Sequence, residues 1–527
     1  MKKKKKNHNN HRKEMLIEKE KEMAYSREMK SIYLPISTGK LIVLMNEVDA
    51  KELGVLPLDR VELFHSKSKK KVVAIVDVTS AFVKENEIGI YLEAAEKIAC
   101  KKGEMVNVKP IPKPDSLYHI RRKIEGEKLE EKHIKEIVKD ITDNKISEIE
   151  LSAFMTSVFI HGFDLDETVA MTKALIENGK TIKLRKGPVL DKHSVGGING
   201  RATMIIIPII ASQGFYIPKT SSRSITSSAG TADAMEVLAN VNLSFDQIKK
   251  ITEKVGAVIC WGGAVDLAPA DDKIIKVEHP LSLDPEGQVV ASVMAKKASV
   301  GAKAVVIDLP IGPDVKIKSI EQAKTLAHKF IEVGKRLGIK VEAVLTNGSE
   351  PSGKAFGPAL EAKYVMEILE GKFFDNLAQK SVELSGVLLE LTGKAKKGQG
   401  TKLAKKILES GLALKKMREI IKAQGGKISK SEQIELSNLK ETIKSADSGE
   451  ISRINVRGLA KIARIAGAPF DKKAGVMLIV KEGEKIIKGS KLFEIYAENS
   501  RKLKLSLEYA NKYPPIELQQ IILEKIA

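Results

Sequence analysis

Residues 188 to 440 alternate short apolar runs with longer amphipathic stretches, and this pattern constrains the fold more than any other feature of the sequence. One amphipathic stretch, Ser319–Leu337, has the length and period of a crossover helix. Strands that alternate with helices indicate a parallel or mixed sheet with helices on its faces. Ligands of such sheets bind beyond the carboxyl ends of the strands. The predicted strands are Val189–Lys192, Phe215–Lys219, Ala257–Trp261, Lys303–Leu309 and Val341–Thr346.

Two segments rich in glycine and hydroxyl groups accompany the first two of these runs. The first reads DKHSVGGINGRAT from Asp191, and the second reads KTSSRSITSSAGTADAMEVL from Lys219. Glycine lets backbone N–H groups approach an anion closely, and a helix that begins just after them presents its positive end. Because the carboxyl ends of parallel strands meet at one sheet edge, the two turns together predict one anion site.

A glycine turn by itself is as consistent with a tight connection between two elements as with an anion site. A Walker-type phosphate loop is excluded, because Gly200 is followed by Arg201 and Ala202 rather than by Lys and Ser or Thr. The spacing of Gly196, Gly197 and Gly200 does not match the dinucleotide-binding fingerprint either. What distinguishes these turns is the number of lysine and hydroxyl side chains gathered in them.

The order of strand-like and helix-like segments along the whole chain predicts a multidomain α/β protein. Short β-branched runs before residue 113 indicate strands, and the apolar period that follows is that of helices. Asp164, with Glu167 three residues on, predicts a capped helix start. The predicted parts are a basic disordered tail (1–30), a small β-rich N-terminal domain (31–113), a helical subdomain (114–187), a central mixed or parallel α/β phosphate-binding domain (188–440, with a contribution to the helical subdomain around 265–300) and a C-terminal α+β domain (441–527).

Composition limits the classes of function. The formal net charge of +21 suits phosphate-bearing substrates, but a basic arm that contacts nucleic acid or a membrane surface would also explain part of it. Cys100 and Cys260 alone imply no disulfide framework and favour a reducing cytoplasm. The run Met204–Ala211 contains Pro208 and is too short to span a bilayer. The nine histidines and two cysteines lack ligand spacing, so no metal site is predicted.

The segment KTSSRSITSSAGTADAMEVL resembles the signature of the thymidine/pyrimidine nucleoside phosphorylase family, and DKHSVGG resembles its phosphate loop. LAPADDK at 267–273, ASVMAKK at 291–297 and SGKAFGPALEA at 352–362 follow in the order of that family. The resemblance covers roughly residues 114–520. Within the family, the extra N-terminal domain, the TSSR variant and the LSLD segment are similar to the archaeal-type AMP phosphorylases.

The resemblance implies a reaction in which inorganic phosphate attacks the anomeric carbon of a nucleotide and the base leaves. Asp284 matches the proton donor to the leaving base, although an Asp before Pro285 is also a common turn opener. No cofactor is implied, and phosphate is the co-substrate. The resemblance implies AMP or phosphate contacts at Gly196, Ser222, Arg223, Ser224, Ile225, Thr226, Ser227, Thr231, Ser292 and Lys316, with further candidates at Lys192, Ser194, Thr203, Ser221 and Lys296.

Several positions leave alternatives open. Arg223 either binds substrate or braces its loop through Asp233 or Glu236, because a guanidinium group fits both roles. Where the archaeal-type phosphate loop continues as GVPGNK, this chain has GINGRA, which makes Arg201 a candidate phosphate ligand and leaves the role of Asn199 open. The acidic residues of the LAPADDK region, Asp266, Asp271 and Asp272, are interpreted as organising a turn rather than donating protons.

On this resemblance we expect an AMP phosphorylase that forms adenine and ribose 1,5-bisphosphate in nucleotide salvage, with CMP and UMP as further candidate substrates. A thymidine or pyrimidine nucleoside phosphorylase is the nearest alternative. Pyrimidine-specific members carry an arginine where this chain has Glu278, and a carboxylate cannot donate the same hydrogen bond. A non-enzymatic nucleic-acid-binding protein is the second alternative, motivated by the charge. The family also implies a homo-oligomer, at least a dimer, in the cytoplasm and not in a membrane.

Overall fold

The computed structural model describes residues 26–185, 187–196, 199–224, 227–265 and 267–519. Residues 1–25 of the predicted basic tail therefore lie outside the described residues. Residues 27–30, which the prediction placed in that tail, belong to a strand instead. The chain divides into two compact units. The first contains the residues up to His161 together with Lys276–Leu283, and the second contains Gly162–Ile275 and the chain from Asp284 onward.

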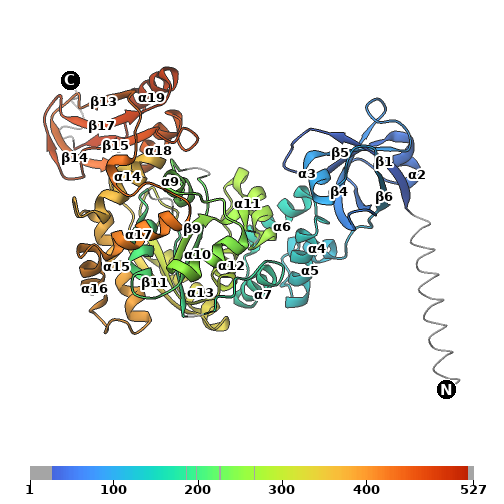
Figure 1. The fold of residues 1–527 in the computed structure, drawn as a ribbon, viewed down its shortest axis with the longest axis horizontal. Coiled ribbons are helices and arrows are strands. Elements are labelled where there is room, and N and C mark those ends of the chain that lie inside the picture. Colours follow the sequence, from blue (N-terminus) through green and yellow to red (C-terminus); the bar gives the residue numbers. More distant parts are fainter. Residues whose placement is uncertain (1–25, 186, 197–198, 225–226, 266, 520–527) are drawn as a thin grey trace, which may run out of the picture. The chain divides into compact units, whose positions relative to one another are not determined.

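A closed six-stranded barrel forms the amino-terminal part of the first unit (blue in Figure 1). The strand order is β1-β5-β2-β4-β3-β6, and β1 closes the barrel by pairing parallel with β5 and antiparallel with β6. The short β-branched runs before residue 113 form its strands, as predicted, and in β3 alternate residues are buried. The strands are β1 Arg27–Leu34, β2 Ile42–Asn46, β3 Arg60–His65, β4 Lys70–Thr79, β5 Glu87–Tyr91 and β6 Met105–Pro110, with short helices α2 Glu47–Leu53 and α3 Leu92–Ile98.

Helices follow the barrel, as the apolar period predicts. The first unit contains α4 Ser116–Ile124, α5 Glu131–Thr142 and α6 Glu148–His161. The second unit begins with α7 Leu165–Glu177, whose start carries the predicted capping box. The Asp164 side chain accepts from the Glu167 backbone N–H at 2.8 Å, and Glu167 accepts from the Asp164 N–H at 3.0 Å. Among the described residues, no helix is long and apolar enough to cross a membrane.

Parallel strands at the centre of the second unit confirm the predicted sheet. The strands β11-β10-β7 pair in parallel, β8 pairs in parallel with β9, and a parallel bridge between Val189 and Tyr216 connects the two sets. The strands are β7 Val189–Ser194, β8 Ile217–Ser221, β9 Ala257–Trp261, β10 Ala302–Ile311 and β11 Lys340–Asn347. The helices between them are α8 Ala202–Ala211, α9 Thr231–Leu238, α10 Phe245–Val255, α11 Pro269–Glu278, α12 Glu286–Ser299 and α13 Ile320–Arg336.

The apolar run Met204–Ala211 lies within α8, which is buried on all sides in the largest hydrophobic core. A helix that is apolar all round must be covered all round. Helices of the chain's later part supply that cover: α14 Pro358–Leu369, α15 Asn376–Leu391, α16 Gly400–Glu409 and α17 Leu412–Ala423. The helix after the phosphate loop is therefore fixed firmly in the core.

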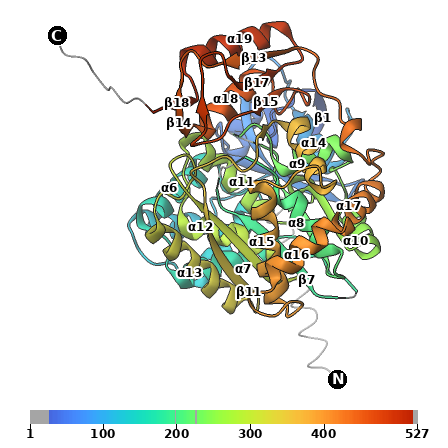
Figure 2. The same ribbon diagram turned by 90° about the vertical axis from the view of Figure 1, so that its left-hand side faces the viewer.

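The carboxyl-terminal part is an α+β arrangement, as predicted (red in Figures 1 and 2). One sheet has the order β12-β15-β17-β13, and a second has the order β16-β14-β18. Strand β12 is Ala355–Phe356 from the SGKAFGPALEA motif, so this sheet includes a segment of the central region. The remaining elements are β13 Lys440–Lys444, β14 Gly449–Ile454, α18 Val456–Ile465, β15 Gly475–Leu478, β16 Lys485–Ile486, β17 Lys491–Tyr496, α19 Ser500–Lys512 and β18 Ile516–Leu518.

Candidate active site

Loops at the carboxyl ends of the parallel strands carry several of the predicted site residues. The phosphate loop (residues 195–201) follows β7, and the hydroxyl loop (residues 222–230) follows β8. Lys316 lies after β10 in the same unit. Since all these strands run in the same direction, their following loops meet at one edge of the sheet. Ile225 and Thr226 of the predicted set lie outside the described residues.

Asp308 connects three elements beneath this edge. It lies on β10, is 1 % exposed, and accepts hydrogen bonds of 2.6 Å from the hydroxyls of Ser194 on β7 and Thr346 on β11. Lys380 on α15 pairs with it at 3.1 Å, and Lys192 lies 3.6 Å away. Burial alone would raise the pKa of Asp308, but the two lysines outweigh burial and hold this pKa below its ordinary value.

Asp191 forms a second buried centre of charge on β7. Its carboxylate pairs with Lys297 of α12 at 2.6 Å and with Lys219 of β8 at 3.2 Å. Burial opposes ionisation of Asp191 as well, and the two lysines again lower its pKa overall. Four lysines therefore surround two aspartates, a formal excess of two positive charges close to the phosphate loop.

This excess of positive charge affects the lysines and the neighbouring histidine. Burial lowers the pKa of Lys192 to about 8, and Asp308 only partly opposes this shift. Burial, followed by the nearby lysines Lys297, Lys219 and Lys192, lowers the pKa of His193 well below its ordinary value. His193 is therefore a neutral imidazole at pH 7. A site built this way attracts an anion and disfavours a further cation.

Asn199 and Arg201, two residues at which the phosphate loop departs from the archaeal-type sequence, anchor this loop to the SGKAFGPALEA segment. The Asn199 amide donates to the carbonyl of Ala355 at 3.1 Å, and its oxygen accepts from the N–H of Ser352 at 3.1 Å. Arg201 forms an ion pair with Glu361, which is 1 % exposed. This geometry favours a bracing role for Arg201, and its interpretation as a phosphate ligand stays a prediction. Its guanidinium group neutralises a buried carboxylate, and an unpaired carboxylate there would be strongly unfavourable.

The hydroxyl loop folds around the carboxylate of Asp233, at the start of α9. Asp233 accepts from the backbone N–H groups of Ser224 at 2.7 Å and Gly230 at 2.8 Å. A Cβ atom on Gly230 would lie 2.5 Å from the carbonyl oxygen of Ser222, so only glycine allows the loop to cross itself here. The Ser227 hydroxyl turns inward and donates to the Ala229 carbonyl at 3.0 Å.

Arg223 is held by carboxylates within the protein. It donates to Glu236 through both terminal nitrogens, at 2.8 and 2.5 Å, and to Asp233 at 3.1 Å. Its guanidinium carbon lies 5.1 Å from the centroid of the Trp261 ring. Hydrogen bonding from Arg223 lowers the pKa of Glu236 to about 2, although burial opposes this shift. This geometry favours the bracing role among the two alternatives for Arg223.

Ser292 and Lys296 lie one turn apart on α12 and share the same partner. The Ser292 hydroxyl donates to Asp271 at 2.7 Å, and the Lys296 ammonium pairs with Asp271 at 2.7 Å. Gln288 donates to the other oxygen of this carboxylate at 3.2 Å. Asp271 is fully buried in the first turn of α11, so it connects α11 to α12 rather than organising a turn, and its contacts are those of an acceptor. Asp266, interpreted together with it, lies outside the described residues.

Asp284 and Lys316, the predicted proton donor and an AMP contact, lie together. Their ion pair is 2.5 Å long, and about half of each side chain is exposed. Asp284 stands just before Pro285, at the start of the helix that carries Ser292. The pair is therefore accessible to a ligand from solvent.

The other predicted residues lie at the ends of strands and the starts of helices. A Cβ atom on Gly196 would lie 2.5 Å from the Pro310 side chain, so any larger residue at this position would clash. Ser221 ends β8 and the exposed Ser222 follows it. Thr203 and Thr231 lie in the first turns of α8 and α9, half-buried. Each of these threonines therefore lies where a helix N-terminus favours an anion.

Sequence reasoning missed most of the charge network. Asp308, Lys380, Lys219 and Lys297 are absent from the predicted set, and Asp191 has no role assigned in it. One signal was present, because Asp308 interrupts a buried apolar strand, and a charge there requires partners. The identity of those partners depends on strand register and helix packing, which the local sequence does not reveal.

Comparison with known families defines the class of the chain. Residues 118–179 match the glycosyl transferase family, helical bundle domain, and residues 186–414 match the glycosyl transferase family, a/b domain. Residues 450–517 match the pyrimidine nucleoside phosphorylase C-terminal domain. The fold is also that of anthranilate phosphoribosyltransferase from Thermus thermophilus, with a TM-score of 0.51 at 19% identity over 58% of this chain and 99% of that chain. The expected multidomain α/β fold is confirmed.

Relatives that align with this chain over nearly their whole length define its family more closely. The chain is 47% identical over 498 residues to AMP phosphorylase 1 of Archaeoglobus fulgidus, covering 94% of this chain and 98% of that protein. It is 45% identical over 496 residues to AMP phosphorylase of Thermococcus kodakarensis, with the same coverage. The chain therefore belongs to the AMP phosphorylase family, and the resemblance described from its motifs is confirmed.

We expect Arg223→Ala to destabilise the protein, because it leaves the buried Asp233 carboxylate and Glu236 with fewer partners. Loss of a partly exposed pair of this kind costs about 1–2 kcal/mol. Thermal unfolding measures the effect. Arg336→Ala is the matched control, because it removes an exposed ion pair with Asp166 of 3.0 Å and should change the midpoint little. A rise in the KM for phosphate without loss of stability would contradict the bracing role.

Proposed function

We propose that this protein catalyses the phosphorolysis of AMP to adenine and ribose 1,5-bisphosphate. The observation that carries the proposal is the excess of buried lysine beside two loops that together suit a phosphate dianion. Family membership at 47% identity to a relative of that name supports it. CMP and UMP are further candidate substrates, and inorganic phosphate is the co-substrate.

The proposed reaction places phosphate against the face of the sugar opposite the base. Backbone N–H groups of the phosphate and hydroxyl loops, with Lys192, hold the dianion near the anomeric carbon. As the C–N bond to the base breaks, a phosphate oxygen forms the new bond to that carbon. Positive charge develops on the sugar in this step, and a fixed dianion beside it lowers the barrier.

Asp284 is the proposed proton donor to the departing base. Protonation of a ring nitrogen lets adenine leave as a neutral molecule. In the structure Lys316 neutralises Asp284. We propose that the phosphate of a bound nucleotide competes for Lys316, and that the released Asp284 carboxylate then takes up a proton from solvent, which it donates to the departing base. The pair would then couple recognition of the 5′-phosphate to proton transfer.

Ser292 and Lys296 are proposed to face the base from α12, with Asp271 positioning both. The ion pair of Lys296 with Asp271 fixes the ammonium group, and the Ser292 hydroxyl is oriented by the same carboxylate. Asp271 is thus a positioning residue of the proposed site. The expected homo-oligomer and cytoplasmic location stay predictions, and light scattering after size-exclusion chromatography measures the oligomer.

The deciding experiment offers AMP, CMP, UMP, adenosine, uridine and thymidine in parallel and measures base release that depends on phosphate. Release from the monophosphates alone supports the proposal, because it makes the 5′-phosphate a recognised group. Release from uridine or thymidine would instead favour the nucleoside phosphorylase alternative. Absence of turnover with every substrate would favour the non-enzymatic alternative.

Asp284→Asn should reduce kcat for AMP by about 10²–10⁴-fold, with a much smaller change in KM, because the lost proton transfer acts in the transition state. Glu286→Gln is the matched control. Glu286 lies two residues away and also pairs with a lysine, Lys329, at 2.6 Å. Steady-state kinetics measures both variants. An unchanged kcat for Asp284→Asn would remove this residue from the mechanism.

The KM for phosphate should rise with pH above about 8. Lys192 carries its charge below that pH and loses it above, because burial lowers its pKa to about 8. The charged fraction then falls by about 10-fold per pH unit, and the KM should rise in proportion. Initial rates at a fixed AMP concentration, with phosphate varied at each pH, measure this rise in KM. Lys192→Met should show a high KM at every pH, whereas a flat wild-type profile would show that Lys192 does not bind phosphate.

A further inference from the structure

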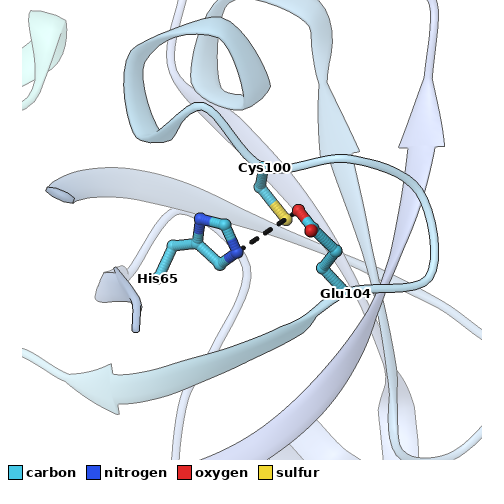
Figure 3. A group of neighbouring side chains, drawn as sticks. All are labelled: His65, Cys100 and Glu104. Carbon is cyan, nitrogen blue, oxygen red and sulfur yellow. Dashed lines mark ion pairs between the residues drawn. The ribbon is translucent and has the colours of Figure 1, made fainter. Parts of the chain in front are cut away.

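Three side chains of the amino-terminal barrel bring an imidazole, a thiol and a carboxylate together (Figure 3). The donor atoms of His65, Cys100 and Glu104 all lie within 4.8 Å of one another. His65 ends β3, Cys100 follows α3, and Glu104 stands immediately before β6. Their separation in the sequence explains why the spacing of histidines and cysteines predicts no metal motif.

The tautomer of His65 is set by its other neighbour. His65 is 2 % exposed, and its Nδ1 lies 3.0 Å from the hydroxyl oxygen of Ser68. Ser68 donates its single hydrogen to the carbonyl of Ile98 at 2.6 Å. Ser68 must therefore accept from His65, and Nδ1 carries the proton. A neutral ring then has a lone pair on Nε2, the arrangement that a metal ligand requires.

The lone pair on Nε2 has no adequate partner within the barrel. The described residues provide it with no hydrogen bond, although Oε2 of Glu104 lies 3.3 Å away. Two electron-rich atoms at this distance repel each other unless a positive charge lies between them. A proton could supply that charge and form an imidazolium–carboxylate pair. The thiol of Cys100, directed at the same point in Figure 3, favours a metal ion instead.

The loop that carries two of the three donors is already ordered. The Ser31 carbonyl accepts from the N–H of Gly103 at 2.8 Å, and the Ser31 N–H donates to the carbonyl of Glu104 at 2.9 Å. The Ser31 hydroxyl donates to the Lys101 carbonyl at 2.8 Å, and the Lys101 N–H donates to the Glu104 carboxylate at 2.7 Å. Such a loop holds its donors in place before a ligand arrives, which lowers the entropy cost of binding.

We propose that His65, Cys100 and Glu104 bind a zinc ion in the barrel, at a site separate from the proposed active site. Nitrogen, sulfur and oxygen donors in one cluster suit Zn²⁺, with a water molecule in the fourth position. A thiolate and a carboxylate balance the charge of the ion. Tetrahedral ligands at about 2.0–2.3 Å from zinc lie roughly 3.5 Å apart, so a closure of about 1 Å completes the site.

Metal binding displaces the thiol proton, since the ligand is the thiolate. Burial raises the pKa of Cys100, so the thiol keeps its proton when no metal is bound. The groups around the thiol are His65, the Glu104 carboxylate, the Ser31 hydroxyl, the Lys101 carbonyl, which accepts from the thiol at 3.5 Å, and Lys67, which pairs with Glu104 at 3.0 Å. Metal binding therefore exchanges the hydrogen bond to Lys101 for a bond to the ion. The ion would connect β3 to the segment between α3 and β6, a cross-link within the barrel.

The test uses the full-length protein without an affinity tag, stripped of metal with a chelator. Equilibrium dialysis against Zn²⁺, followed by elemental analysis, should find one equivalent of bound zinc per chain. The Cys100→Ser variant should lose this zinc, and the Cys260→Ser variant should keep it. Cys260 is the matched control because it is the other cysteine and lies buried on β9. With Co²⁺ in place of Zn²⁺, only chains with Cys100 should show a thiolate-to-cobalt absorption band. Ser68→Ala should weaken binding by about 10–100-fold.

A second measurement needs no variant and so does not depend on a mutant folding. Zinc should slow alkylation of Cys100 in the wild-type protein, measured by mass spectrometry, with Cys260 as the internal reference. The proposal would be overturned if zinc left the alkylation of Cys100 unchanged, or if the Cys100→Ser variant still bound one equivalent of zinc. In the latter case the imidazolium–carboxylate pair would explain the cluster, and the metal would belong elsewhere, for example at His8 and His11.

Discussion

The buried carboxylate of Asp308 is the interaction on which the proposed site depends. A charge within a central strand is strongly unfavourable unless it is fully paired, and breaking a buried pair by removing one partner costs several kcal/mol. Asp308 satisfies this requirement only when Ser194, Thr346 and Lys380 come together from β7, β11 and α15. One carboxylate thereby fixes the strand end from which the phosphate loop leaves, and it does so before any ligand binds.

Glu361 imposes a similar constraint on the loops themselves. A glycine-rich loop has many accessible backbone conformations, so its shape must come from side-chain contacts. Glu361 pairs with Arg201 of the phosphate loop and accepts from the Gly357 N–H at 3.1 Å. Burial raises its pKa, and Arg201 limits that rise. The motif SGKAFGPALEA therefore acts as a structural support for the phosphate loop, which gives a physical reason for a segment whose role the sequence leaves open.

Much of the fold follows from the sequence, because the periods of strands and helices are local properties. All five predicted strands of the central sheet are present, and the Asp164 capping box is formed. The charge network is not local. Ser194 and Asp308 are 114 positions apart and meet only through the register of parallel strands. Lys296 and Lys297 illustrate the limit, since adjacent helical residues point in different directions. The first pairs with Asp271 and the second with Asp191.

The two arginines near the loops show why charge alone misleads about phosphate ligands. A guanidinium fork fits a carboxylate as well as it fits a phosphate, so the sequence cannot separate the two uses. Arg201 and Arg223 are both neutralised by carboxylates within the protein. In the proposed site, the positive charge left for a dianion would then come from the lysines, which outnumber Asp191 and Asp308 by two. In the proposed site, arginine thus shapes the loops, whereas buried lysine and backbone N–H groups would supply the attraction, and the lysine contribution would weaken as pH rises.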